Sequence, residues 1–291
     1  MQVALHFGAP YTDENRLQLC LGKNREKLAE VGTFIPRPSS YRKNLRPVLH
    51  KFRGGLGDDA LREEFITSVA GDTQPDRVVF STDNFLGVPR MSVREDQFYP
   101  GYPNRLDSFL QLFDGADVEL YFATCNPATY LQSMIKAHPG EDPQSLIEYS
   151  DPMQLRWSQF IARIRDIYPQ LPMTVWCNED SPLIWQEIIR EIAGVDPTFE
   201  LAGAFDFLEE IMIPEGFKRF KDYIAQRPNI TVVQQKRVIA AFLEKFARDD
   251  ILEEDIDFPG WTEMHVDALT ELYDEDIYEI EKIPDVKFLT P

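Results

Sequence analysis

Short apolar segments alternate with helix-forming segments four times in the first two hundred residues of this chain. The apolar segments cover residues 3–7, 77–82, 118–124 and 173–177. Residues 77–82 read RVVFST, the kind of run expected for a strand buried on both faces of a parallel sheet. Parallel strands need a crossover connection, which is usually a helix. The alternation therefore predicts an α/β fold, a parallel sheet with helices on both faces.

The spacing of apolar residues predicts where the connecting helices lie. They are expected over residues 15–31, 58–69, 104–113, 126–137, 151–168 and 181–193. Asn126 before Pro127 is a helix start, and Gly194 is a helix stop. Residues 34–47 contain three prolines, and we expect them to form a connection.

The strand pattern disappears after Gly203. Helices are expected over residues 205–225, 231–248 and 265–283, and residues 286–289 are a candidate last strand. Helices that pack over a sheet edge need no core of their own. We therefore expect one domain over residues 1–291, in which residues 203–291 are a mostly helical extension.

The negative charge is concentrated near the C-terminus. The chain has 49 acidic and 30 basic residues, a formal net charge of −19. Residues 249–285 hold 15 of the acids and one base, Lys282, which leaves 34 acids and 29 bases elsewhere. This argues against a nucleic-acid partner, which needs a basic face. A solvated acidic surface and a tail for a basic partner both stay open.

Other features indicate a cytoplasmic protein. The sequence has no run of roughly 18 apolar residues, so no membrane span is expected. It does not begin with a basic segment followed by an apolar one, so no signal peptide is expected. Cys20, Cys125 and Cys177 are odd in number and far apart, which fits a reducing compartment and gives no metal-binding spacing.

The first strand leads into a loop at the position where α/β proteins hold phosphate groups. Gly8-Ala9-Pro10 ends the strand, and helical spacing returns at Asn15. Strand, tight loop and helix is the arrangement that places an anion on backbone N–H groups. Yet this loop carries Asp13 and Glu14, with no Lys, no Arg and no second Gly.

The stretch LHFGAPYTDENRLQ, followed by NREKLAEVGTFIP, resembles the N-terminus of bacterial sulfotransferase-family proteins. The resemblance implies a P-loop NTPase-like parallel sheet and the sulfonate donor PAPS, with adenosine 3′,5′-bisphosphate as product. The family's loop pattern is G-x-x-K-T-G-[ST]-[ST]. Five residues of this chain match the family's pattern for the loop and the helix after it: Gly8, Pro10, Thr12, Leu17 and Gln18. Tyr11 stands in place of the Lys, Asp13 in place of the Gly, and Glu14 and Asn15 in place of hydroxyl residues.

A second family signature follows a later strand, where an Arg and a Ser bind the 3′-phosphate. The stretch YFATCNPATYLQSMIKA fits this frame, with Ser133 at the Ser position and Cys125 at the Arg position. A Cys cannot make the bidentate, charge-assisted contact of an Arg with phosphate. By resemblance, the cofactor-binding positions are therefore Gly8, Pro10, Tyr11, Thr12, Asn15, Cys125 and Ser133.

A transferase would also need a general base to deprotonate its acceptor. His50 is the candidate, because it follows the proline-rich segment and has Lys51 and Arg53 beside it; the alternative is a surface residue. His6 lies inside the first strand and is interpreted as a core or sheet-edge histidine whose hydrogen bonds are satisfied. Asp83 and Asn84 follow a strand, where ligands collect, but a turn explains them equally well.

These observations predict a sulfotransferase-family protein with an eroded PAPS site, inactive or repurposed as a binding protein for a small molecule or a protein. The alternative is an active PAPS-dependent sulfotransferase with a hydroxyl or amine acceptor. That enzyme needs another source of positive charge at the loop. The candidates lie in one segment: Arg37, Arg42, Lys43, Arg46 and Arg53.

Overall fold

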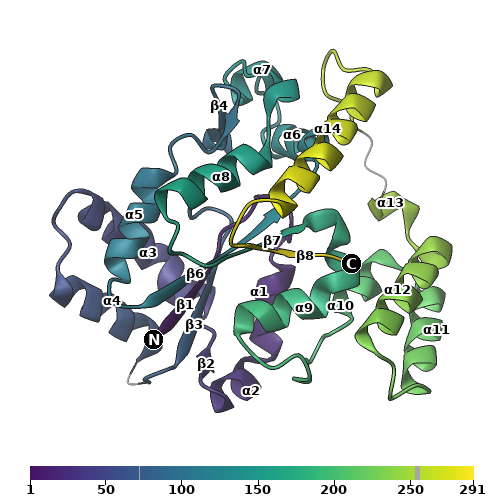
Figure 1. The fold of residues 1–291 in the computed structure, drawn as a ribbon, viewed down its shortest axis with the longest axis horizontal. Coiled ribbons are helices and arrows are strands. Elements are labelled where there is room, and N and C mark those ends of the chain that lie inside the picture. The colour runs from purple at the N-terminus through teal and green to yellow at the C-terminus, as the bar shows by residue number, and fades with distance from the viewer. Residues whose placement is uncertain (72, 253–255) are drawn as a thin grey trace.

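A six-stranded parallel sheet forms the centre of the structure, a computed structural model that describes residues 1–71, 73–252 and 256–291 (Figure 1). The strands run in the order β2-β3-β1-β6-β7-β8, and each neighbouring pair is parallel. Their bounds are β2 Thr33–Phe34, β3 Arg77–Ser81, β1 Gln2–His6, β6 Asp117–Thr124, β7 Met173–Cys177 and β8 Val286–Leu289. A small antiparallel pair, β4 (Val93–Arg94) and β5 (Gln97–Phe98), lies in the crossover between β3 and β6.

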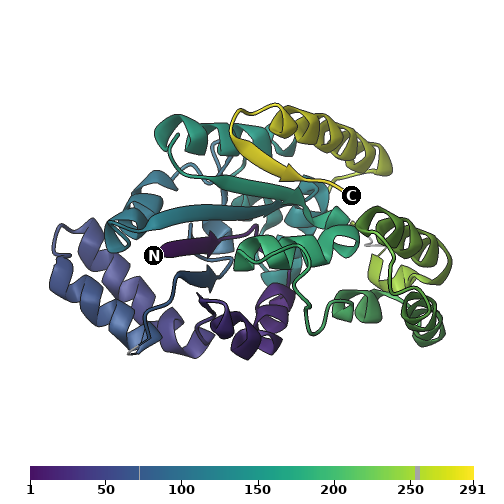
Figure 2. The same ribbon diagram turned by 60° about the horizontal axis from the view of Figure 1, so that its bottom comes forward.

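Helices cover both faces of this sheet (Figure 2). One core contains side chains from α3 (Pro38–Arg53), α4 (Asp59–Ala70), α5 (Pro103–Leu112), α6 (Pro127–Ala137), α8 (Trp157–Ile167) and α14 (Glu263–Glu281). The other contains side chains from α1 (Arg16–Lys23), α2 (Arg25–Glu30) and α9 (Ser181–Ala193). Alternate residues of a strand point to opposite faces. Leu5 and Phe7 therefore belong to the first core and Ala4 to the second. The predicted α/β fold class, a parallel sheet flanked by helices, is confirmed.

The C-terminal helices form a third cluster before the chain returns to the sheet. Helices α10 (Asp206–Ile211), α11 (Pro214–Ala225) and α12 (Val232–Phe246) pack around Leu208, Ile211, Met212, Phe217, Phe220 and Ile239. The short helices α7 (Pro143–Leu146) and α13 (Asp249–Leu252) lie on either side of this region in sequence. Helix α14 packs against α8, and β8 then pairs with β7, as expected for residues 286–289 (Figure 1). The single domain stays a prediction. Among the described helices, none is both long and apolar enough to cross a membrane.

The expected connection over residues 34–47 is wrong, because α3 begins at Pro38 and continues through Pro47 to Arg53. A proline in the first turn of a helix removes no intrahelical hydrogen bond. Pro47 lies inside the helix, where proline costs about 3 kcal/mol. Burial of the apolar side of α3 offsets this cost at about 1.5–3 kcal/mol for each large side chain. That side consists of Tyr41, Leu45, Leu49 and Phe52.

Three other expected helices, over residues 15–31, 151–168 and 205–225, are each divided. The first breaks at Asn24, whose side chain accepts a hydrogen bond from the backbone N–H of Ala202 (2.7 Å). The second starts as a single 3₁₀ turn, Pro152–Gln154, and α8 begins after it. The third breaks before Pro214, which starts α11. In each case a tertiary contact or a proline interrupts an apolar periodicity that continues across the break.

Candidate functional site

The loop between β1 and α1 lies at the carboxyl ends of the sheet strands, where α/β proteins place ligands. Its first residues extend the pairing of β1 with β6, because the backbone N–H of Ala9 donates to the carbonyl of Ala123 (2.7 Å). The buried hydroxyl of Thr12 donates to the carbonyl of Ala9 (2.6 Å). Tyr11, Glu14 and Asn15 all have positive φ, between 47° and 67°. Such conformations cost non-glycine residues about 1–3 kcal/mol each, and they occur often at functional sites.

Asp13 occupies the N-terminus of α1 with its own carboxylate. One oxygen accepts a hydrogen bond from the backbone N–H of Asn15 (3.2 Å) and the other from that of Leu17 (3.3 Å). These are the donors that a phosphate at a helix N-terminus requires. A negative side chain here is favourable for the helix dipole. The position of an external anion is therefore filled by a group of this chain.

Glu14, the other acid of the loop, is held outside by an ion pair with Arg16 (3.0 Å). Arg16 also pairs with Glu210 (2.6 Å), and its guanidinium lies 4.8 Å from the ring centre of Phe207. Two carboxylates and one ring thus surround this cation. Arg16 does not supply free positive charge to the loop.

Tyr11, at the position of the family's lysine, packs in a T-shaped arrangement with Tyr130, with the ring centres 5.7 Å apart. Burial, and then the charge of Asp83, raise the pKa of Tyr11 to about 12, so the phenol is neutral at physiological pH. Its hydroxyl has no hydrogen-bond partner among the described residues. A neutral, mostly apolar group thus takes the place of a cation.

His6 lies beneath the loop at the end of β1 and is 2% exposed. Its Nδ1 is 2.9 Å from the hydroxyl of Ser81, and its ring stacks on Trp176. Burial lowers the pKa of His6, while Asp13 and Asp83 act in the opposite direction. Burial, and then Asp13, raise the pKa of Asp83. The edge of the sheet therefore combines a neutral imidazole with two carboxylates. His6 is a core histidine, as the sequence predicted, but it is not fully hydrogen-bonded, because its Nε2 has no partner among the described residues.

Cys125 and Ser133, the positions of the second signature, are placed by β6 and α6. Cys125 is 3% exposed, and its carbonyl accepts a hydrogen bond from the indole of Trp157 (2.7 Å). Asn126 caps α6, as predicted, by accepting from the backbone N–H of Ala128 (2.9 Å). Ser133 is half-buried in the second turn of α6. An α-helix rises about 1.5 Å per residue, so Ser133 lies about 10 Å beyond the cap.

A carboxylate next to these residues was not identified as a site residue from the sequence. Glu179 accepts hydrogen bonds from the backbone N–H of Asn126 (2.8 Å) and from the hydroxyl of Tyr273 (3.0 Å). Tyr273 lies 3.1 Å from the hydroxyl of Thr124. Burial raises the pKa of Glu179. Its position directly after a strand was the available signal, but its partner Tyr273 comes from α14, 94 residues later.

One basic side chain reaches the loop from α3. The guanidinium of Arg42 donates to the side-chain oxygens of Asn15 (3.3 Å) and Gln18 (3.2 Å). The neighbouring Tyr41 donates to the carbonyl of Ser81 (2.8 Å), which holds this end of α3 against the sheet. His50 is exposed and lies eight residues further along α3, about 12 Å away along the helix axis. The structure thus brings Arg42 to the predicted cofactor positions and places His50 toward the other end of the helix.

The described residues contain no group of three or more His, Cys, Asp or Glu side chains that could hold a metal ion. No protein-family model matches the chain. No curated protein matches it either. Among solved structures, the chain is similar to the crystal structure of a sulfotransferase from Alicyclobacillus acidocaldarius, with 13% sequence identity and a TM-score of 0.42. The match covers 82% of this chain and 97% of that one. This degree of similarity says nothing about individual side chains.

Proposed function

We propose that this protein is a sulfotransferase-like protein that does not hold PAPS at the loop after β1 and that works as a binding protein. The observation that carries the proposal is the carboxylate of Asp13 on the backbone N–H groups of Asn15 and Leu17. A bound phosphate would have to displace this carboxylate or lie against it. Tyr11 and Cys125 supply no cation at the two positions where the resembled family has one.

The size of the effect follows from Coulomb's law. Two unit charges 4 Å apart repel by about 1 kcal/mol at an effective dielectric constant of 80 and about 4 kcal/mol at 20. Asp13 and Asp83 both lie at the loop. A penalty of about 4 kcal/mol converts a micromolar dissociation constant into a millimolar one. Loss of the family's Lys and Arg weakens binding further, because charge-assisted bonds are the strong ones.

The second candidate is an active PAPS-dependent transferase, and the position of Arg42 favours it. In that reading Arg42 replaces the missing loop lysine, and Gly8, Thr12 and Ser133 contact phosphates. Sulfonate would pass from PAPS to a hydroxyl or amine acceptor, with His50 as the base. His50 lies about 12 Å along α3 from Arg42. An active transferase would therefore require a movement of α3, or an acceptor long enough to reach from the loop to His50.

Calorimetric titration with adenosine 3′,5′-bisphosphate separates the two. For the wild type we expect binding weaker than micromolar, that is, a binding free energy less favourable than about −8 kcal/mol. The double variant Tyr11→Lys/Asp13→Gly restores the cation and removes the internal anion, and it should bind at least tenfold more tightly. The variant Glu26→Gln/Glu30→Gln, two exposed changes in α2 that alter the net charge by the same two units, controls for net charge.

Asp13→Gly removes a helix cap, so each variant must be shown to be folded. Its melting temperature provides this check. Micromolar binding to the wild-type loop, or sulfonate transfer from PAPS, would overturn the proposal. Equal affinity of wild type and double variant would also count against it, because the internal anion would then have no effect.

A further inference from the structure

Three arginines form a stripe along α3. At about 100° per residue, Arg46 and Arg53 lie about 40° and 20° around the helix axis from Arg42. All three are exposed, and the stripe runs beside the buried side of the helix. Arg42 is the one that reaches the loop. The stripe therefore extends from the carboxyl edge of the sheet along the length of α3.

A fourth arginine, Arg105 on α5, joins this stripe. Helices α3 and α5 pack against each other, and Arg105 is half-buried. Its guanidinium lies against Gly87, where an added Cβ would come within 3.1 Å of it. Burial, and then the charges of Arg53 and Arg46, lower the pKa of Arg105. We call Arg46, Arg53 and Arg105 the arginine cluster.

Among the described residues, the arginine cluster lacks a carboxylate partner. In the part of the chain that the structure describes, none of its three members forms an ion pair. Other arginines do pair, for example Arg90 with Glu141 (2.7 Å). The chain carries 19 more acids than bases. The cluster therefore brings together three mutually repelling cations that have no ion-pair partner among the described residues.

We propose that the arginine cluster binds the phosphate or sulfate group of a small-molecule ligand. Guanidinium groups match such oxyanions in geometry, with two parallel N–H donors each. The guanidinium of Arg105 lies against Gly87, in the loop that follows the carboxyl end of β3, so the cluster lies beside the carboxyl edge of the sheet. The remainder of the ligand would then extend toward Asp83 at that edge.

A small ligand fits better than a nucleic acid. The cluster contains three side chains, whereas the protein as a whole carries a strong negative charge that repels a long polyanion. This inference rests on the proposed binding function and identifies its ligand class, but it does not use the loop after β1. The two can therefore fail separately.

Titration with inorganic pyrophosphate tests the cluster directly. For the wild type we expect a dissociation constant of about 1 mM or tighter, weakened about tenfold by Arg53→Gln or Arg105→Gln, since a hydrogen bond to a charged group is lost. Lys51→Gln is the matched control, because Lys51 is an exposed cation of α3 about 160° around the axis from the stripe. Its affinity should equal that of the wild type.

The melting temperature without ligand provides a second readout. Arg53→Gln should raise it by a few degrees, because one of three repelling charges is removed, and should reduce the further rise that pyrophosphate causes. A merely structural arginine would do the opposite and lower it. Displacement of pyrophosphate by 4-nitrophenyl phosphate or by 4-nitrophenyl sulfate then identifies which ester the cluster prefers.

Several results would overturn the inference. These are no binding of pyrophosphate, equal loss of binding in Lys51→Gln, no displacement by either ester, or tighter binding of single-stranded RNA than of pyrophosphate. Adenosine 3′,5′-bisphosphate separates this inference from the proposed function. If Arg53→Gln abolishes its binding, the arginine cluster holds it. If micromolar binding survives in Arg53→Gln and Arg105→Gln, the loop holds it and the proposed function fails instead.

Discussion

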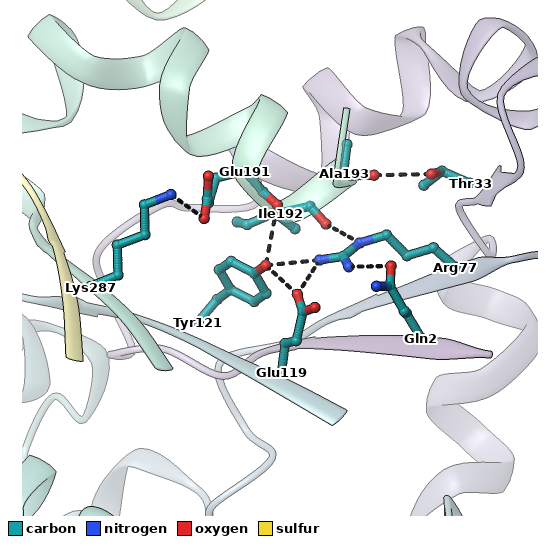
Figure 3. A network of polar contacts seen from close by, with 9 residues as sticks. All are labelled: Gln2, Thr33, Arg77, Glu119, Tyr121, Glu191, Ile192, Ala193 and Lys287. Carbon is teal, nitrogen blue, oxygen red and sulfur yellow. Dashed lines mark hydrogen bonds and ion pairs between the residues drawn. The ribbon is translucent and has the colours of Figure 1, made fainter. Parts of the chain in front are cut away.

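Arg77 lies in a network of polar contacts (Figure 3). Among the polar side chains, it is the one whose replacement we expect to reduce the stability of the protein most. It is buried at the start of β3, and its guanidinium donates to four acceptors. These are the carbonyl of Ile192 (3.0 Å), the side chain of Gln2 (3.0 Å), the carboxylate of Glu119 (2.6 Å) and the hydroxyl of Tyr121 (2.8 Å). The group thus joins three strands of the sheet to the end of α9.

Arg77→Met should destabilise the protein by about 3 kcal/mol. Removal of one partner of a buried ion pair costs about 3–5 kcal/mol, because the other charge is left uncompensated. The side chain of Glu119 is 22% exposed, against 5% for Arg77, and water solvates it partly. Tyr121 continues to donate to it at 2.7 Å. Both facts favour the lower end of the range.

The double variant Arg77→Met/Glu119→Leu should recover at least half of the loss, since apolar replacement of a whole buried pair is often neutral. Urea denaturation measures both, with the slope of the transition as a check that unfolding stays comparable. Lys287→Met is the control. It breaks the more exposed pair of Lys287 with Glu191 (2.6 Å), which should be worth no more than about 1 kcal/mol.

The effect should also depend on pH. Burial acts to raise the pKa of Glu119, but hydrogen bonds from Arg77 and Tyr121 outweigh it and hold this pKa below the usual value. A carboxylate with a lowered folded pKa contributes stability above its unfolded pKa, about 4.3, and the contribution is lost as pH falls. The difference between wild type and Arg77→Met should therefore shrink below about pH 5. A difference under 1 kcal/mol at pH 7, or a double variant as unstable as the single one, would refute the reasoning.

Three further predictions concern other residues. Burial raises the pKa of Glu179, so the contribution of this residue to stability should decline as pH rises from about 4.3 through the raised pKa. Glu179→Gln should remove that decline, which is measured as the change in melting temperature between pH 4 and 7. Trp157→Phe should cost about 1–3 kcal/mol in urea denaturation, because a buried carbonyl loses its indole donor. Gly194→Ala should cost about 1–3 kcal/mol by the same assay, since Gly194 has φ +65° and a Cβ there meets the side chain of Arg77 at 2.8 Å. Gly140→Ala, at φ +85° with no atom within 4 Å, should cost less.

The sheet could be predicted from the sequence because its signals are local. Each long strand is a short apolar run, and Gly194 ends α9 in the left-handed conformation that such a stop requires. The elements that were missed have weaker local signals. Strand β2 is two residues long, as are both strands of the small antiparallel pair. The start of α8 depends on Asp276, which accepts from the backbone N–H of Trp157 (2.6 Å) across 119 residues.

The candidate site was predictable in position but not in its contacts. The loop after β1 could be located from Gly8 and the helical spacing that follows Asn15. The carboxylate of Asp13 lies on the helix N-terminus rather than in solvent. This contact depends on the backbone conformation of the loop, which the sequence does not report. Burial raises the pKa values of Asp83 and Glu179, and the charge of Asp13, far from Asp83 in the sequence, raises that of Asp83 further. No local pattern reports these effects.

The proline-rich segment connects the error in the fold to the gap in the site. As long as residues 34–47 are taken as a connection, Arg42, Arg46 and Arg53 are scattered basic residues with no common direction. Once Pro38–Arg53 is a helix, their spacing of four and seven residues places them on one side of it. Helix α3 packs against α5, and this packing adds Arg105. The loop after β1 lacks positive charge, but α3, close to it, carries three arginines. The prolines of this segment led to the wrong prediction that it is a connection rather than a helix.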